Sequence, residues 1–234
     1  RPAVPQLLFF SLLSCPPPQL PALSLPSALP FFLVSGFWFV GATYLSIVPT
    51  FGKVLLNADE KAVTLLTAAF TLGIGIGSLS CERLSRGRIE LGLVAYGALL
   101  ISLASLDVYC SGMPAESSTK MTVATFFMTP AAVRMFIDLV IIGAAGAMYI
   151  VPLYAALQAR VEPARCSRTL AALNVVNALF MVGSAGFTLV LFQLGVVIPQ
   201  VFGIVGVLNA MLMVYAMWKM PEFGPRATRL FKAD

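Results

Sequence analysis

Two asparagines, Asn174 and Asn177, lie one helical turn apart inside a long apolar segment of this sequence. Met181, Ser184 and Thr188 continue the same spacing of three and four residues, so a helix would carry all five in one stripe. Carboxamides inside a membrane cost free energy unless they are paired or wetted. The pair therefore favours a wet cavity or a polar binding site, and helix–helix packing is the structural alternative.

A second group of polar residues follows a proline in the preceding apolar segment. Pro152 removes one backbone hydrogen bond, and we expect it to bend a helix at that point. Tyr154 and Gln158 come just after the proline, near the end of the segment. Bent helices with freed carbonyl groups often line transport pathways. Tyr154 and Gln158, together with Asn174 and Asn177, are therefore the candidate substrate-binding residues.

The same segment contains a carboxylate, Asp138, with Arg134 four residues earlier. Residues at this spacing share a helix face, so the sequence predicts a local ion pair between them. A site for a proton or a ligand is the alternative.

Several kinds of chemistry are excluded by residue type. The chain has no histidine, which removes Ser-His-Asp and Cys-His catalysis and most zinc sites. The cysteines are widely spaced and form no metal-binding or disulfide pattern: Cys15, Cys81, Cys110 and Cys166. We expect neither a catalytic residue nor a metal or cofactor site in this chain.

The composition indicates that the chain lies in a membrane. Of the 234 residues 59% are hydrophobic and 11% are charged, and the mean hydropathy is +0.92. A typical soluble domain is about 25% charged. Six apolar runs are long enough to cross a bilayer, and helices are expected because barrel strands would alternate apolar and polar residues. The runs are Pro30–Thr50, Lys61–Cys81, Ile89–Val108, Met135–Leu157, Thr169–Leu194 and Ile198–Trp218.

The positive charges predict the orientation of these spans. Eleven of the fifteen Lys and Arg residues fall at the two termini and in the second and fourth loops, all on one side. The bias predicts that both termini lie in the cytoplasm. Because the net charge of +5 comes from such clusters between apolar runs, nucleic acid is not an expected partner.

The chain is expected to have three parts. Residues 1–30 hold eight of the sixteen prolines and form a Pro-rich leader or the edge of a fragment, since the sequence starts without Met. Residues 31–220 form the six-helix unit, and residues 221–234 form a basic cytoplasmic tail. The longest link, from Tyr109 to Pro130, divides the helices into two groups of three, as in many transporter halves.

The second loop carries a cluster of charges that could act as a conformational gate. Glu82 and Arg86 are spaced to pair at a helix end, and Arg83 and Arg88 flank them. One hypothesis is a latch that holds one state of a transporter by ion pairs. The alternative is a basic loop that only sets topology.

This loop resembles the motif G-x-L-x-D-R-x-G-R-K of the major facilitator superfamily, with Glu82, Arg83 and Arg86 in its acidic and basic positions. Further strings resemble the lysophospholipid transporter family, in particular members fused to a glycerophospholipid acyltransferase and an acyl-carrier-protein ligase. These strings are Gly77–Ser85, Arg88–Val94, Tyr149–Ala155, Asn174–Leu179 and the ending Pro221–Phe223.

The resemblance covers about Leu33–Phe223 and implies an all-α membrane protein that is the 3+3 C-terminal half of a twelve-helix major facilitator fold. It implies transport of lysophospholipids, chiefly lysophosphatidylethanolamine, to the inner leaflet of a bacterial inner membrane for re-acylation. The implied partners are the lysophospholipid, membrane lipids, an N-terminal transporter half and, as in the fused members, an acyltransferase domain. Two alternatives stay open: a half-transporter for another amphipathic or drug-like solute, and a membrane anchor of a fused acyltransferase that transports nothing.

Overall fold

The computed structural model describes residues 25–85, 89–111, 120–161 and 163–219. Within these ranges the chain has six long helices and no β-strand, and each of the six is long and apolar enough to span a membrane. The helices are α2 (Leu25–Thr50), α3 (Glu60–Ser85), α4 (Gly92–Cys110), α6 (Pro130–Arg160), α7 (Pro163–Gln193) and α8 (Ile198–Lys219). The six predicted spans are confirmed, and the chain is an all-α integral membrane protein.

The helix ends differ from the apolar runs by a few residues. α2 begins five residues before the first run, within the predicted leader, and continues into one π-helical turn, η1 (Phe51–Leu55). A short helix, α5 (Val123–Phe126), lies in the longest link and is capped by Thr122 and Thr125. Pro130 occupies the first turn of α6, where its missing N–H has no helical partner to lose. Residues 1–24 and the basic tail 221–234 lie outside the described residues.

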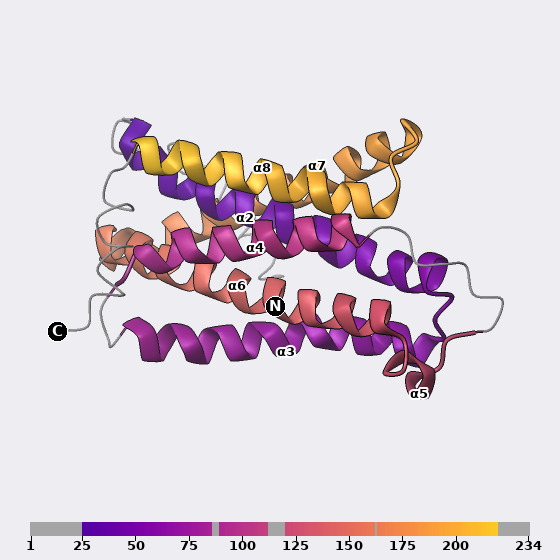
Figure 1. The fold of residues 1–234 in the computed structure, drawn as a ribbon. Coiled ribbons are helices and arrows are strands. Elements are labelled where there is room, and N and C mark those ends of the chain that lie inside the picture. Colours follow the sequence, from indigo (N-terminus) through magenta and orange to yellow (C-terminus); the bar gives the residue numbers. More distant parts are fainter. Residues whose placement is uncertain (1–24, 86–88, 112–119, 162, 220–234) are drawn as a thin grey trace, which may run out of the picture.

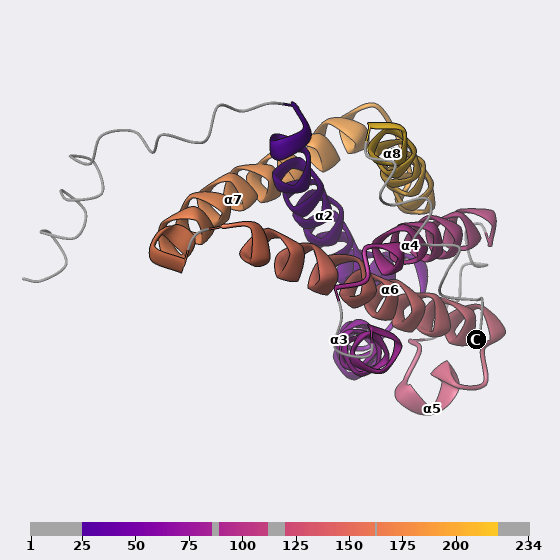
Figure 2. The same ribbon diagram turned by 90° about the vertical axis from the view of Figure 1, so that its left-hand side faces the viewer.

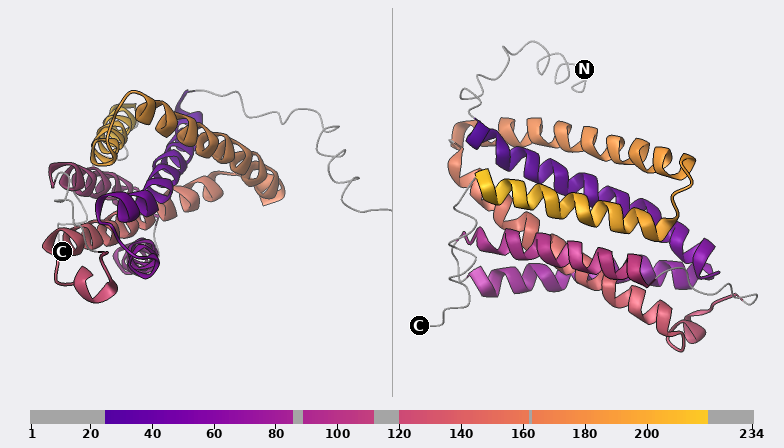
Figure 3. Two further views of the ribbon diagram at one scale, coloured as in Figure 1. Left: turned by 90° about the vertical axis from the view of Figure 1, so that its right-hand side faces the viewer. Right: turned by 45° about the horizontal axis from the view of Figure 1, so that its top comes forward.

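Successive long helices run in opposite directions (Figure 1). α3, α6 and α8 start at the end of the bundle where α5 lies, which we call the α5 end, and α2, α4 and α7 start at the opposite end. α6 packs between α3 and α4, α8 packs on α4, and α2 joins α6, α7 and α8 (Figures 2 and 3).

Glycines let α3 approach α6 closely. A Cβ atom at Gly73 or Gly77 would collide with the backbone of Val140 or Ala144, and one at Gly143 would collide with the backbone of Phe70. Small residues at such crossings allow the backbones of membrane helices to touch. These contacts fix α3 on α6 over two turns.

α7 is the least covered helix of the bundle. Only 17% of its membrane window is buried within the chain, whereas the other five helices bury 39–56%. Its main neighbour is α2. Much of the α7 surface is therefore free to meet lipid or another protein segment.

Candidate functional site

Four side chains from three helices form a hydrogen-bonded group, which we call the polar cluster. The Tyr154 hydroxyl on α6 accepts hydrogen bonds from Trp38 Nε1 on α2, at 3.3 Å, and from Asn177 Nδ2 on α7, at 3.2 Å. The Ser35 hydroxyl on α2 donates to Asn177 Oδ1 at 2.9 Å. The cluster links α7 to both α2 and α6.

Asn177 is a structural part of this cluster as well as a candidate ligand-binding residue. Its side chain is 4% exposed, and both ends of its carboxamide are engaged. The amide still has a second N–H, and the oxygen has a second lone pair. A bound polar group could therefore hydrogen-bond to Asn177 only through the remaining N–H or lone pair, or by replacing one of the existing hydrogen bonds.

Tyr154 and Trp38 are half-buried, so they form the accessible edge of the cluster. Phe37 lies beside Trp38 and stacks on Tyr149, with ring centroids 5.5 Å apart, which fixes this face of α2 against α6. The Trp38 indole is thus held in place by its contact with Phe37 as well as by its hydrogen bond to Tyr154.

The side chains of the other two predicted site residues are exposed. Asn174 is exposed on α7, one turn before Asn177, and Gln158 is exposed on α6, one turn after Tyr154. Neither side chain has a hydrogen bond to another described residue. The structure therefore brings Tyr154 and Asn177 together and leaves Asn174 and Gln158 as unengaged polar groups on the same two helices.

Pro152 does not interrupt α6, which runs as one helix from Pro130 to Arg160. The proline is buried, two residues before Tyr154. The bend that the sequence predicts at this position stays a prediction.

The predicted gate is described only in part. Glu82 and Arg83 are exposed in the last turn of α3, and no ion pair joins them. Arg86 and Arg88 lie outside the described residues. The latch hypothesis stays a prediction.

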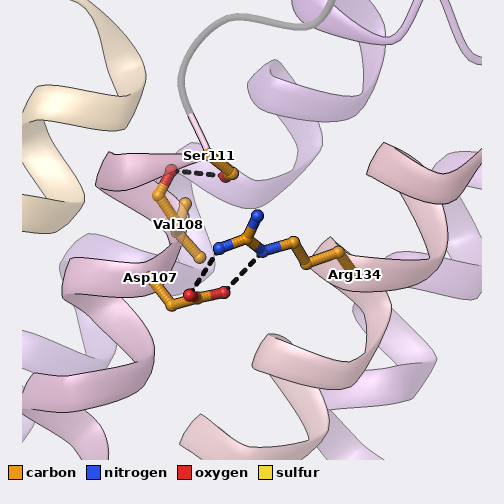
Figure 4. Close-up of polar contacts among 4 residues, drawn as sticks. All are labelled: Asp107, Val108, Ser111 and Arg134. Carbon is orange, nitrogen blue, oxygen red and sulfur yellow. Dashed lines mark hydrogen bonds and ion pairs between the residues drawn. The ribbon is translucent and has the colours of Figure 1, made fainter.

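The predicted ion pair between Arg134 and Asp138 is wrong. Arg134 instead forms a bidentate ion pair with Asp107 near the end of α4 (Figure 4). Its Nε donates to Oδ2 at 2.7 Å, and its Nη2 donates to Oδ1 at 2.6 Å. A planar guanidinium matches a carboxylate in this geometry, and a carboxylate on a neighbouring helix can present both oxygens. Asp138 is 5% exposed, and its Oδ2 has no hydrogen-bond partner among the described residues.

Three residues of these sites were not among the sequence-based candidates: Ser35, Trp38 and Asp107. A tryptophan N–H within an apolar run needs an acceptor, so Trp38 carried a usable signal. Asp107, a carboxylate close to the end of the third run, carries a similar signal. Ser35 carried none, because small hydroxyl residues are common in membrane helices.

Asn209 is a further buried carboxamide, but it lies apart from the cluster. It donates from α8 to Ala98 O and to Ser102 Oγ on α4, both at 2.9 Å. These hydrogen bonds hold α8 on α4. Asn209 therefore provides a structural counterpart against which the role of Asn177 can be measured.

No protein-family model, curated protein or solved structure matches this chain in the three comparisons made. Among the described residues, no group of three or more Cys, Asp and Glu side chains is arranged to hold a metal ion. What the chain does is therefore inferred from its own residues and their geometry.

Proposed function

We propose that this chain is the C-terminal six-helix half of a lysophospholipid transporter of the major facilitator type. The six antiparallel spans provide the number and length of helices that such a half requires. The sequence resemblance over Leu33–Phe223 supplies the substrate class: lysophospholipids such as lysophosphatidylethanolamine, moved to the inner leaflet for re-acylation.

The observation that carries the proposal is the polar cluster with unengaged carboxamides beside it. A lysophospholipid has a polar headgroup with a phosphate and only one acyl chain. The side chains of Asn174 and Gln158 can donate to phosphate oxygens, and the Trp38–Tyr154 edge provides further polar atoms. The acyl chain would lie along the apolar faces of α6 and α7, where membrane lipid also lies.

The low burial of α7 supports a second transporter half as a partner. A helix whose membrane surface is mostly uncovered and includes an exposed asparagine is better placed against protein or water than against lipid alone. In the proposed complex, an N-terminal half faces α7, and the two halves rock about a site between them. Glu82, Arg83, Arg86 and Arg88 would act as the gate at the cytoplasmic ends of the helices.

The proposal is tested by transport in liposomes. The full-length protein, with any segments that flank residues 1–234, is reconstituted, and inward movement of fluorescent lysophosphatidylethanolamine is followed by back-extraction with albumin. We expect Asn174→Leu/Asn177→Leu to slow transport at least about tenfold, which corresponds to about 1.4 kcal/mol of lost headgroup interaction.

Asn209→Leu is the matched control, because it also removes a buried carboxamide with two hydrogen bonds but lies on the α8–α4 contact. It should keep the transport rate per folded protein. Normal transport by the double variant would remove the asparagines from the site. Absence of lysolipid transport by the unmodified protein would leave the alternatives, another amphipathic solute or a membrane anchor.

A further inference from the structure

Asp138 is an ionisable group that the proposed headgroup site does not use. It lies two turns after the start of α6, within the membrane-spanning part of that helix. Tyr154 is sixteen residues further along, about 24 Å along the helix axis, toward the opposite end of the bundle. Asp138 and the polar cluster are thus separate sites on one helix.

The local geometry gives Asp138 no fixed counter-charge. The guanidinium that could neutralise it, Arg134, is one turn away on the same face of α6 but donates both of its hydrogen bonds to Asp107 (Figure 4). Asp138 Oδ2 has no hydrogen-bond partner within the part of the chain that the structure describes, and the side chain is 5% exposed. Burying an ionised carboxylate without a partner costs much free energy, whereas burying a neutral carboxylic acid costs much less.

The charged neighbours that act on Asp138 are Asp107 and Arg134. The helices packed on α6 carry few other ionisable groups in the halves nearest the α5 end. Those on α4 are Tyr109 and Cys110, and those in the first turn of α3 are Glu60 and Lys61. The remaining one is Tyr44 on α2, whose hydroxyl is hydrogen-bonded to that of Ser105 at 2.6 Å.

We propose that Asp138 is a proton-binding site whose occupancy is controlled by the choice of partner of Arg134. With Arg134 on Asp107, Asp138 holds the proton as a carboxylic acid. When Arg134 turns to Asp138, the O–H bond breaks, the proton passes to water at the α5 end, and the Asp138 carboxylate pairs with the guanidinium. Asp107 then keeps its negative charge in contact with water, since its side chain is already 41% exposed.

The exchange makes α6 a two-state element, because the ion pair that ties it to α4 exists in only one of the two states. Tyr154 of the polar cluster is on the same helix, so a shift of α6 would change the positions of both Asp138 and Tyr154. On this basis, and resting on the proposed lysophospholipid transport, we infer that transport is coupled to the proton gradient through Asp138.

The first test is infrared difference spectroscopy of the purified full-length protein, recorded between acidic and alkaline pH. The unmodified protein should show the C=O stretch of a buried carboxylic acid that disappears on raising the pH. Asp138→Asn should lack this signal, and Glu90→Gln, which removes a carboxylate just before the start of α4, should keep it. Asp107→Asn should lose the signal at a lower pH, because it frees Arg134 to pair with Asp138.

A signal that persists in Asp138→Asn, or that is absent from the unmodified protein at every pH, would overturn the proton site. The measurement needs no transported substrate, so it stands even if lysophospholipid transport is not found. The second test compares liposomes with and without a proton gradient. The rate of transport by the unmodified protein should change with the gradient, and the rate of transport by Asp138→Asn should not. A rate that is the same with and without the gradient in the unmodified protein would refute the coupling.

Discussion

Arg134 on α6 donates two hydrogen bonds to Asp107 on α4, at 2.6 and 2.7 Å, although Asp138 is the carboxylate one turn away on its own helix. The pair ties the beginning of α6 to the end of α4 at the α5 end of the bundle. It also leaves a buried carboxyl group, that of Asp138, with one oxygen that has no hydrogen-bond partner in the described ranges of the chain. The partner of Arg134 thus determines the environment of both acids.

Arg134 and Asp107 should stabilise the protein through their ion pair, so that losing either side chain removes the same contribution. Arg134→Gln and Asp107→Asn are each expected to lower the unfolding temperature in detergent slightly, because both side chains are about half exposed. The double variant should unfold at about the temperature of the less stable single variant. Additive losses, measured by thermal unfolding, would indicate that the two side chains do not act as a pair.

The α3–α6 crossing depends on the absence of side chains at its glycines. Gly77→Val would push a side chain into the backbone of Ala144 and should destabilise the protein by about 1–3 kcal/mol. Gly75→Val is the control two residues away, since a Cβ there meets no atom within 4 Å. Equal unfolding temperatures for the two variants would contradict the close packing of α3 on α6.

Substitution of the two asparagines of α7 should affect stability differently, although both substitutions should slow transport. Asn177→Leu removes the acceptor of the Ser35 hydroxyl and one of the two donors to the Tyr154 hydroxyl. We therefore expect a loss of about 1–2 kcal/mol in stability together with slower transport. Asn174→Leu should slow transport and leave stability unchanged, because the side chain is exposed and unengaged. A large loss of stability in Asn174→Leu would show that its role is structural.

The Tyr154 hydroxyl is the atom on which the hydrogen bonds from α2 and α7 converge. Tyr154→Phe keeps the ring and removes both hydrogen bonds, so transport should fall about fivefold, equivalent to about 1 kcal/mol. Trp38→Phe in the same background should add little, since the acceptor of its N–H is already absent. Tyr215→Phe, on the exposed face of α8, serves as the control for a lost phenol and should transport normally.

The six spans could be predicted because they depend on local properties, the length and apolarity of each segment. All six runs correspond to helices, and the structure extends most of them by a turn at one end. A segment of four residues such as α5 has no periodic signal of its own and was not predicted.

The sites could be predicted only in part, because their partners are distant in sequence. The Ser35–Asn177 hydrogen bond joins residues 142 positions apart, and nothing near either residue indicates the other. The spacing on α7 predicts one stripe that includes Asn174 and Asn177. A step of three residues falls about 60° short of a full helical turn, and in the structure Asn177 is buried whereas Asn174 is exposed. Arg134 pairs across helices with Asp107, 27 positions earlier, whereas the spacing along its own helix indicates only Asp138.

The most direct test of the proposed headgroup site is photolabelling of the reconstituted full-length protein with lysophosphatidylethanolamine that carries a photoreactive group on its headgroup. We predict adducts on the peptides that contain Tyr154 and Gln158 of α6 and Asn174 of α7, and we expect an excess of unlabelled lysolipid to abolish them. Labelling confined to α8, or labelling that unlabelled lysolipid does not displace, would contradict a lysophospholipid site at the polar cluster.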